Sequence, residues 1–132
     1  MIKPLDKSPE ERFNENPHNA YLVFQMQEGE ELRNLRFQPY NQVQDKLNPA
    51  QYEAVQTGTL PQAEDTQASL NKLYVMLNEP LPWDKQARSL SMGDVLALKQ
   101  DGQITCHYVD KWGYVELPGF LSGKNPLRSL ED

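Results

Sequence analysis

The stretch RSLSMGDVLALKQDGQITCHYVDKWGY, residues 88–114, has the most regular pattern in this sequence. Two short apolar runs, 95–99 and 104–109, are separated by an Asp-Gly pair. Asp-Gly between two such runs is a strong signal for a tight hairpin, so both runs are predicted to be antiparallel strands. A second turn at 110–113 leads into a further apolar run, 114–117. The stretch therefore predicts a three-stranded antiparallel meander.

Two more strands and one main helix are predicted before this meander. The run AYLVFQMQ, 20–27, is apolar on both alternating faces, as expected for an interior strand, and 51–59 is a second strand. The pattern predicts a helix over 66–78, capped by Asp65 or Thr66. This helix is expected to bury an apolar stripe whose members recur at helical spacing: Leu70, Leu73, Tyr74 and Leu77. Short helical turns are expected within 30–36 and 40–47.

These elements predict one α+β domain over residues 20–121. Its antiparallel or mixed sheet has about four to five strands, and a C-terminal meander packs against the one main helix. Residues 1–19 hold three prolines and little apolar periodicity, so a flexible N-terminal arm is expected there. The polar residues 122–132 are expected to form a flexible tail.

The composition disfavours several classes of function. The net charge is −6, and neither half of the chain is basic, because residues 1–60 carry 6 Lys+Arg against 9 Asp+Glu and residues 61–132 carry 7 against 10. Nucleic-acid binders usually need a basic stripe, so this partner is disfavoured. No signal peptide and no run of ~20 apolar residues is found, which predicts a cytoplasmic protein without a membrane partner. The single cysteine and the lack of zinc spacing predict no disulfide, metal or cofactor.

Cys106 and His107 suggest a thiolate with its base, but they are adjacent in a predicted strand. Neighbouring strand residues point to opposite faces, so these side chains cannot form the activating hydrogen bond. Cys106 shares a face with Ile104 and Tyr108 and is predicted to lie in the core. His107 lies on the less apolar face with Thr105, and is expected to be exposed to solvent or at an interface.

Asp94 and Asp110 are predicted to stabilise turns by accepting backbone N–H bonds. An enzyme centred on His107, Asp94 and Asp110 is the alternative, and it requires these three side chains to meet in one cleft. No catalytic residue is assigned. Arg88 with its neighbouring serines could form an anion site, although a turn capped by Ser89 or Ser91 and an ion pair of Arg88 with a carboxylate are the favoured explanation.

Arginines and aromatic residues near the predicted loops suggest a surface that binds another protein. The candidate residues of this surface are Arg36, Tyr40, Arg88, His107, Trp112 and Tyr114. A small RNA- or nucleotide-binding module is a further alternative, by fold analogy with β-barrel domains of the PUA type. It would require Arg36, Arg88, Lys99 and Lys111 to gather into a positive patch.

Several motifs occur together in a characteristic order. They are RFQPY at 36–40, Tyr52, LYVMLN before Pro80, RSLSMGDVLAL at 88–98, HYVD-x-x-GY at 107–114 and Phe120. With these motifs the chain resembles the YodL-like domain family over about residues 20–121, with Tyr114 where phenylalanine is common. The resemblance implies a domain found widely in gut Firmicutes, often on conjugative transposons and other mobile elements. It supplies no catalytic residue, substrate or cofactor. The partner is expected to be an unknown host or mobile-element protein.

Overall fold

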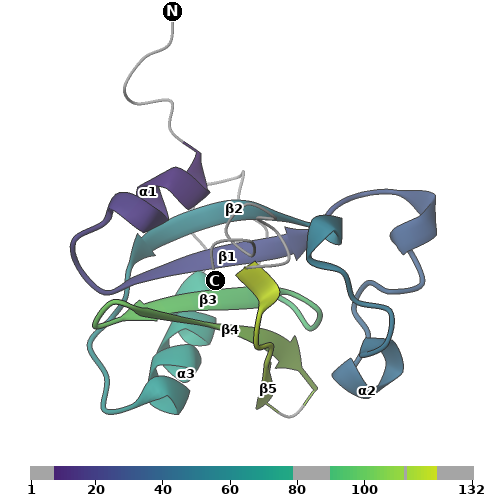
Figure 1. Ribbon diagram of the computed structural model, residues 1–132. Coiled ribbons are helices and arrows are strands. Elements are labelled where there is room, and N and C mark those ends of the chain that lie inside the picture. Colours follow the sequence, from purple (N-terminus) through teal and green to yellow (C-terminus); the bar gives the residue numbers. More distant parts are fainter. Residues whose placement is uncertain (1–7, 79–89, 112, 122–132) are drawn as a thin grey trace, which may run out of the picture.

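The computed structural model describes residues 8–78, 90–111 and 113–121 (Figure 1). The strands form one antiparallel five-stranded sheet in the order β2-β1-β3-β4-β5. The bounds of the strands are Ala20–Met26 (β1), Tyr52–Thr59 (β2), Val95–Gln100 (β3), Gln103–Asp110 (β4) and Gly113–Glu116 (β5). The predicted α+β class, the strand number and the C-terminal meander are confirmed.

The β3–β4 hairpin has the turn that its sequence demands. Asp101 and Gly102 both have positive φ, 53° and 86°, which is the requirement of the two-residue turn that matches strand twist. Strand β1 lies between β2 and β3, as its two apolar faces predicted. Opposite Val23 and Phe24 the β1–β2 register shifts, so that β2 contains a bulge.

The sheet is buried on both faces, and each face has its own apolar cluster. On the face covered by α3 (Thr66–Leu77), the α3 face, the cluster includes Tyr21, Val23, Leu96, Leu98 and Val109. The opposite face, the α1 face, carries the larger cluster, which includes Leu22, Phe24, Val95, Cys106 and Tyr108. In Figure 1, α3 lies behind the sheet. Because side chains alternate along each strand, its odd-numbered residues belong to one cluster and its even-numbered residues to the other.

The helix α3 begins where it was predicted, with the Asp65 side chain accepting from the Ala68 amide at 2.8 Å. Leu70 and Leu73 are buried against the sheet. Tyr74, predicted to lie on the buried stripe, is 40% exposed, and that part of the prediction is wrong. The contact with the sheet is centred on Leu70 and Leu73, and it extends to Ser69, on the opposite side of this pair from Tyr74.

Part of the predicted N-terminal arm is helical. Pro9–Glu15 forms α1, which begins with a capping box between Ser8 and Glu11. Phe13 enters the α1-face cluster and is 1% exposed. The expectation of a loose segment therefore needs correction over residues 8–15. The signal was Pro9 after Ser8, because proline at the first helical position is favourable.

The connection between β1 and β2 contains only short helical pieces. They are η2 (Glu30–Leu32), α2 (Tyr40–Val43) and η3 (Pro49–Gln51). The first two are shorter than the helical turns predicted within 30–36 and 40–47, and η3 was not predicted. Val43 of α2 is buried in the α1-face cluster. No helix in the described residues is long and apolar enough to cross a bilayer.

Candidate functional site

Three segments that are distant in sequence meet at one corner of the sheet: residues 36–40, the turn 90–94 and the end of β4. The Gly93 amide donates to the Val109 carbonyl oxygen at 2.9 Å. The Tyr40 amide donates to Oδ1 of Asp110 at 2.9 Å, and the Tyr108 hydroxyl donates to the carbonyl oxygen of Gln38. This region, termed the motif corner, lies on the side of the molecule near α2 in Figure 1.

A buried polar frame fixes the turn of the motif corner. Oδ2 of Asp94 accepts from the Ser91 amide at 2.8 Å and from Nε2 of Gln25 at 3.2 Å. Asp94 is 6% exposed, and its predicted role as a turn stabiliser is confirmed. The Tyr52 hydroxyl donates to the Gly93 carbonyl oxygen at 2.7 Å. Buried hydrogen bonds of this kind hold the backbone in one conformation.

Burial keeps both tyrosine hydroxyls of the motif corner protonated. Desolvation is the main cause that raises the pKa of Tyr108 to about 12, and the charges of Asp110 and Asp94 add to it. The pKa of Tyr52 is also raised, first by desolvation and then by Tyr108 and Asp94. At neutral pH both phenols are therefore hydrogen-bond donors, as their contacts with backbone carbonyls require.

Close backbone contact holds Phe37 in an unusual conformation. Phe37 has φ 60°, which is a genuine outlier for a bulky side chain. Gly93 has φ 100°, and a Cβ atom at Gly93 would lie 3.2 Å from the Phe37 amide nitrogen. The glycine therefore permits the 36–40 segment to approach the turn, and this packing maintains the strained residue.

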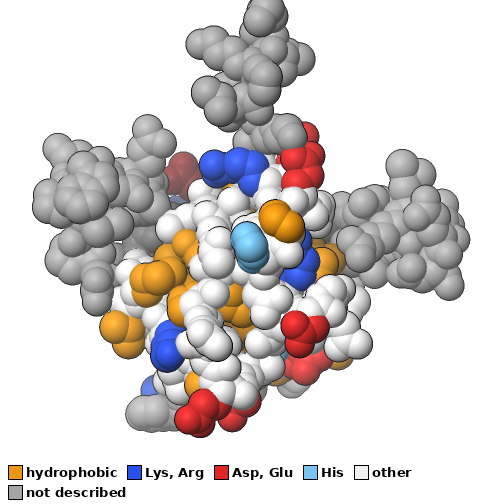
Figure 2. Space-filling view, turned by 90° about the vertical axis from the view of Figure 1, so that its left-hand side faces the viewer, with side chains coloured by type: hydrophobic (Ala, Val, Ile, Leu, Met, Phe, Trp, Pro, Cys, Tyr) orange, Lys and Arg blue, Asp and Glu red, His pale blue; other side chains and the backbone are white. Residues whose placement is uncertain are grey.

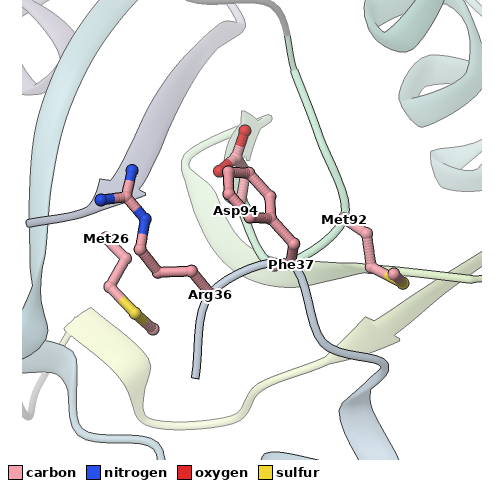
Figure 3. Close-up of a pocket in the computed structure, with 6 residues that line it drawn as sticks. Met26, Arg36, Phe37, Met92 and Asp94 are labelled. Atoms are coloured by element: carbon pink, nitrogen blue, oxygen red, sulfur yellow. The ribbon is translucent and has the colours of Figure 1, made fainter. Parts of the chain in front are cut away.

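Phe37 and Arg36 form the exposed part of the motif corner. The Phe37 side chain is 56% exposed, and Cζ of Arg36 lies 5.5 Å from the centroid of its ring. Figure 3 shows this pair beside Asp94, with Met26 near Arg36 and Met92 near Phe37. The cavity between them has a volume of ≈ 10 Å³, room for about one water molecule. The site thus consists of an exposed aromatic side chain beside a cavity about the size of one water molecule.

Among the residues predicted for one interaction surface, those that the structure describes do not form a single patch. Arg36 and Tyr40 lie in the motif corner, where the Tyr40 ring packs edge-on to Tyr108 at 5.4 Å. Tyr114 belongs to the α3 face, and its hydroxyl donates to the carbonyl oxygen of Leu70 at 3.3 Å. Arg88 and Trp112, also predicted for this surface, lie outside the described residues.

His107 is buried, so its predicted exposure is wrong. It is 5% exposed, and its Nε2 lies 2.8 Å from Oγ1 of Thr105. Burial lowers the pKa of His107, and the charge of Glu116 on β5 opposes this shift. The less apolar face of β4 suggested that His107 would be exposed. This face belongs to the α3 face of the sheet, which segments distant in sequence cover.

Cys106 lies in the core as predicted, on the opposite face of β4 from His107. It is 5% exposed, and burial is the main cause that raises the pKa of its thiol to about 12. A thiol with this pKa is protonated at neutral pH and is a poor nucleophile.

The three residues of the alternative enzyme site have separate partners. Asp110 lies two positions after Tyr108 in β4 and therefore points to the same face as Tyr108, opposite to His107. Its carboxylate binds the Tyr40 amide, 70 residues away in sequence, where a contact within its own turn was predicted. Asp94 is engaged by Ser91 and Gln25. Within residues 8–78, 90–111 and 113–121, no three His, Cys, Asp or Glu side chains lie close enough to hold a metal ion.

Two described cations of the predicted RNA patch, Lys99 and Arg36, lie at opposite ends of the sheet. Lys99 pairs with Ala20 at the start of β1, whereas Arg36 lies near Met26 at its end. Nζ of Lys99 donates to the carbonyl oxygens of Phe13 and Asn16, at 2.6 and 2.7 Å. The described members of this set therefore do not gather into one patch.

Phe37 is the site residue that the sequence did not indicate. Its motif, Arg-Phe-x-Pro-Tyr, gives the aromatic side chain no periodic position, and Phe37 was not among the residues predicted for the interaction surface. The positive φ depends on contact with Gly93, 56 positions later, and no local pattern reports it. The only available signal was the position of Phe37 between an arginine and a proline-restricted residue.

Comparison with known proteins agrees with the resemblance that the motifs indicated. No curated protein and no solved structure matches the chain. A family model described as the YodL-like domain matches residues 20–120, from the start of β1 to Phe120, which is well over half of the chain. The match contains all three segments of the motif corner, so the chain belongs to the YodL-like domain family.

Proposed function

We propose that this YodL-like domain is a non-catalytic protein-interaction or regulatory module that contacts its partner through Arg36 and Phe37. The observation that carries the proposal is the conformation of Phe37: a large apolar side chain, 56% exposed, on a strained backbone. Strained residues persist only where the surrounding structure holds them, and they cluster at functional sites.

Rigidity makes Phe37 suited to anchor a complex. A backbone segment that is already ordered loses little conformational entropy when a partner binds. The Phe37 backbone packs against Gly93. The turn of Gly93 is held by hydrogen bonds, one from the Tyr52 hydroxyl and one to the Asp94 carboxylate. An aromatic anchor in the centre of an interface can supply much of the binding free energy.

Arg36 adds a charge next to this anchor. Its guanidinium group stacks on the Phe37 ring and makes no ion pair with a carboxylate in the described part of the chain. An arginine without a carboxylate partner in its own chain can pair with a carboxylate of another protein through two hydrogen bonds. The partner surface that fits is therefore an apolar pocket with an acidic side chain at its rim.

We also propose where this interaction takes place and with which kind of protein. The family resemblance supports a role in a mobile element such as a conjugative transposon, with a host or mobile-element protein as partner in the host cytoplasm. Nucleic acid is a poorer fit, because of the net charge of −6 and the separation of Lys99 from Arg36.

Cross-linking pull-downs from host lysate test the proposal. Wild-type protein is expected to recover a specific partner that both Phe37→Ala and Arg36→Gln lose. Val75→Ala is the matched control, because Val75 is 61% exposed on α3, away from the motif corner, and this variant is expected to keep the partner. Recovery of no specific partner, or its retention by Phe37→Ala, would contradict the proposal.

A further inference from the structure

A second cavity lies at the end of the sheet opposite the motif corner. Its walls come from the residues before β1, the end of β2 with the loop that follows, the first turns of α3 and the end of β3. The cavity volume is ≈ 500 Å³, whereas roughly 150 Å³ is enough to hold a benzene ring. In Figure 2, which looks onto this end of the molecule, hydrophobic side chains gather beside a histidine. We term this cavity the end cleft.

The lining of the end cleft offers contact surface to an aromatic ring. Leu60, Pro61 and Ala63 supply hydrocarbon surface, and His18 supplies an imidazole ring. The other lining side chains are polar and carry no charge: Asn19, Thr59, Gln62, Ser69 and Gln100. A phenylalanine side chain that is buried in such a cleft removes apolar area from water, which favours binding.

Carboxylates lie around the mouth of the end cleft. Exposed acidic residues directly follow two lining positions, 63 and 100, and they are Glu64, Asp65 and Asp101. Two lysines also lie beside the cleft, and the Nζ of each donates to backbone carbonyl oxygens, Lys72 to that of Gln62 and Lys99 to two near the end of α1. The three carboxylates outnumber these two ammonium groups. An arginine at the mouth can therefore form an ion pair with a carboxylate.

The end cleft therefore has the two features that fit Arg36 and Phe37, apolar surface and carboxylates at its rim. These two residues lie at the other end of the sheet. Strand β1 spans the distance between the two sites with seven residues of about 3.3 Å each, roughly 23 Å in all. Phe37 cannot reach the cleft of its own chain across this distance, so the cleft is open to the Phe37 of another copy.

We propose that Arg36 and Phe37 of one copy bind in the end cleft of a second copy, so that the chain associates head to tail. This inference rests on the proposed role of Arg36 and Phe37 as a binding anchor. A contact between two different surfaces is heterologous, so its repetition gives a ring or an open chain of copies. The net charge of −6 on each copy opposes association, so the complex is expected only at high protein concentration. A copy whose anchor is occupied in this way cannot use the same anchor for another protein.

Sedimentation velocity of the full chain, from about 10 μM to about 1 mM, tests the association. The average mass of the wild type is expected to rise with concentration. Phe37→Ala removes the anchor, and Ala63→Arg places a bulky cation in the half-buried lining of the cleft, so each variant alone is expected to stay monomeric. Val75→Ala, on the exposed side of α3, is the control and is expected to associate as the wild type does.

A mixture of the two variants locates the contact, because each keeps the surface that the other has lost. The mixture is expected to form a complex of two chains and no larger species. In ¹⁵N-labelled Phe37→Ala, unlabelled Ala63→Arg is expected to shift the amides of Leu60, Ala63 and Gln100. Unlabelled wild type is expected to shift the same amides, which keeps the test valid if Ala63→Arg proves unstable. A Phe37→Ala/Ala63→Arg double variant is expected to shift none of them.

The proposal is overturned if the wild type stays monomeric at the highest concentration or if Ala63→Arg associates as the wild type does. It is also overturned if neither Ala63→Arg nor the wild type shifts the amides of labelled Phe37→Ala. Ala63→Arg keeps the anchor and is expected to recover the host-lysate partner. A monomeric wild type whose lysate partner is lost by Phe37→Ala would reject self-association and retain the proposed function.

Discussion

At the scale of single residues, the burial of His107 couples its charge to stability. The unfolded histidine has its ordinary pKa near 6.5, and burial lowers the pKa in the folded protein. Above pH 6.5 both states are neutral at this position. As the pH falls below 6.5, the unfolded state binds the proton first, so the free energy of unfolding decreases until the pH reaches the lower, folded pKa.

The predicted result is that wild-type protein loses stability between pH 7 and pH 5 more steeply than His107→Gln. Urea unfolding at a series of pH values measures this difference. His18→Gln removes the other histidine at an exposed position and serves as the control, which should follow the wild type. Identical pH dependence of wild type and His107→Gln would show that the buried histidine carries no such penalty.

Gly93 supports Phe37 in a way that a side chain should disrupt. Alanine at a positive φ costs roughly 1–2 kcal/mol, and at Gly93 the new Cβ atom would also press on the Phe37 amide. Gly102→Ala is the matched control, since its φ is +86° but nothing lies within 4 Å of the added atom. Gly93→Ala is expected to lower the free energy of unfolding by more than Gly102→Ala does. Equal decreases in the free energy of unfolding would mean that the 36–40 segment moves away from the added atom at little cost.

At the scale of elements, α1 adds to the domain from outside the family match, which begins at residue 20. It packs through Phe13, and Lys99 fixes its C-terminal end by donating to the carbonyl oxygens of Phe13 and Asn16. The lysine ammonium also lies 5.3 Å from the Phe13 ring centroid. A cation is favourable at the negative, C-terminal end of a helix, so the charge of Lys99 stabilises α1 in addition to the packing of Phe13.

Phe13→Ala is accordingly expected to lower the free energy of unfolding by about 3–5 kcal/mol, the usual cost of emptying a buried phenylalanine site. Phe37→Ala, at an exposed phenylalanine, is expected to change it by no more than about 0.5 kcal/mol. Chemical denaturation of the two variants gives both values. A small loss for Phe13→Ala would show that α1 contributes little to the core.

At the scale of the whole molecule, one sheet separates two apolar clusters and has β2 and β5 at its edges. Strands β1 and β3 have neighbours on both sides and are buried along most of their length. The amides of β1 and β3 are therefore predicted to exchange hydrogen most slowly, and those of the four-residue strand β5 faster. Native-state hydrogen exchange followed by NMR measures this order. Protection of β5 equal to that of β1 would indicate that the sheet opens only as a whole.

Local patterns in the sequence determined the elements of this fold. The Asp-Gly turn determined the hairpin, because these residues accept positive φ, and helical spacing of leucines determined α3. Alternation in β4 was sufficient to separate Cys106 from His107. Each of these signals acts between residues only a few positions apart, and so it can be recognised in the sequence.

Only the tertiary structure decided which side chains form the candidate site, and which residues depart from the burial that their local pattern predicted. The Tyr52–Gly93 and Tyr40–Asp110 contacts join residues 41 and 70 positions apart. Exposure of Phe37 and burial of His107 depend on such distant segments, since burial is a property of what covers a face. The sequence by itself therefore determined the strands, the main helix and the family, whereas packing between remote segments created the motif corner.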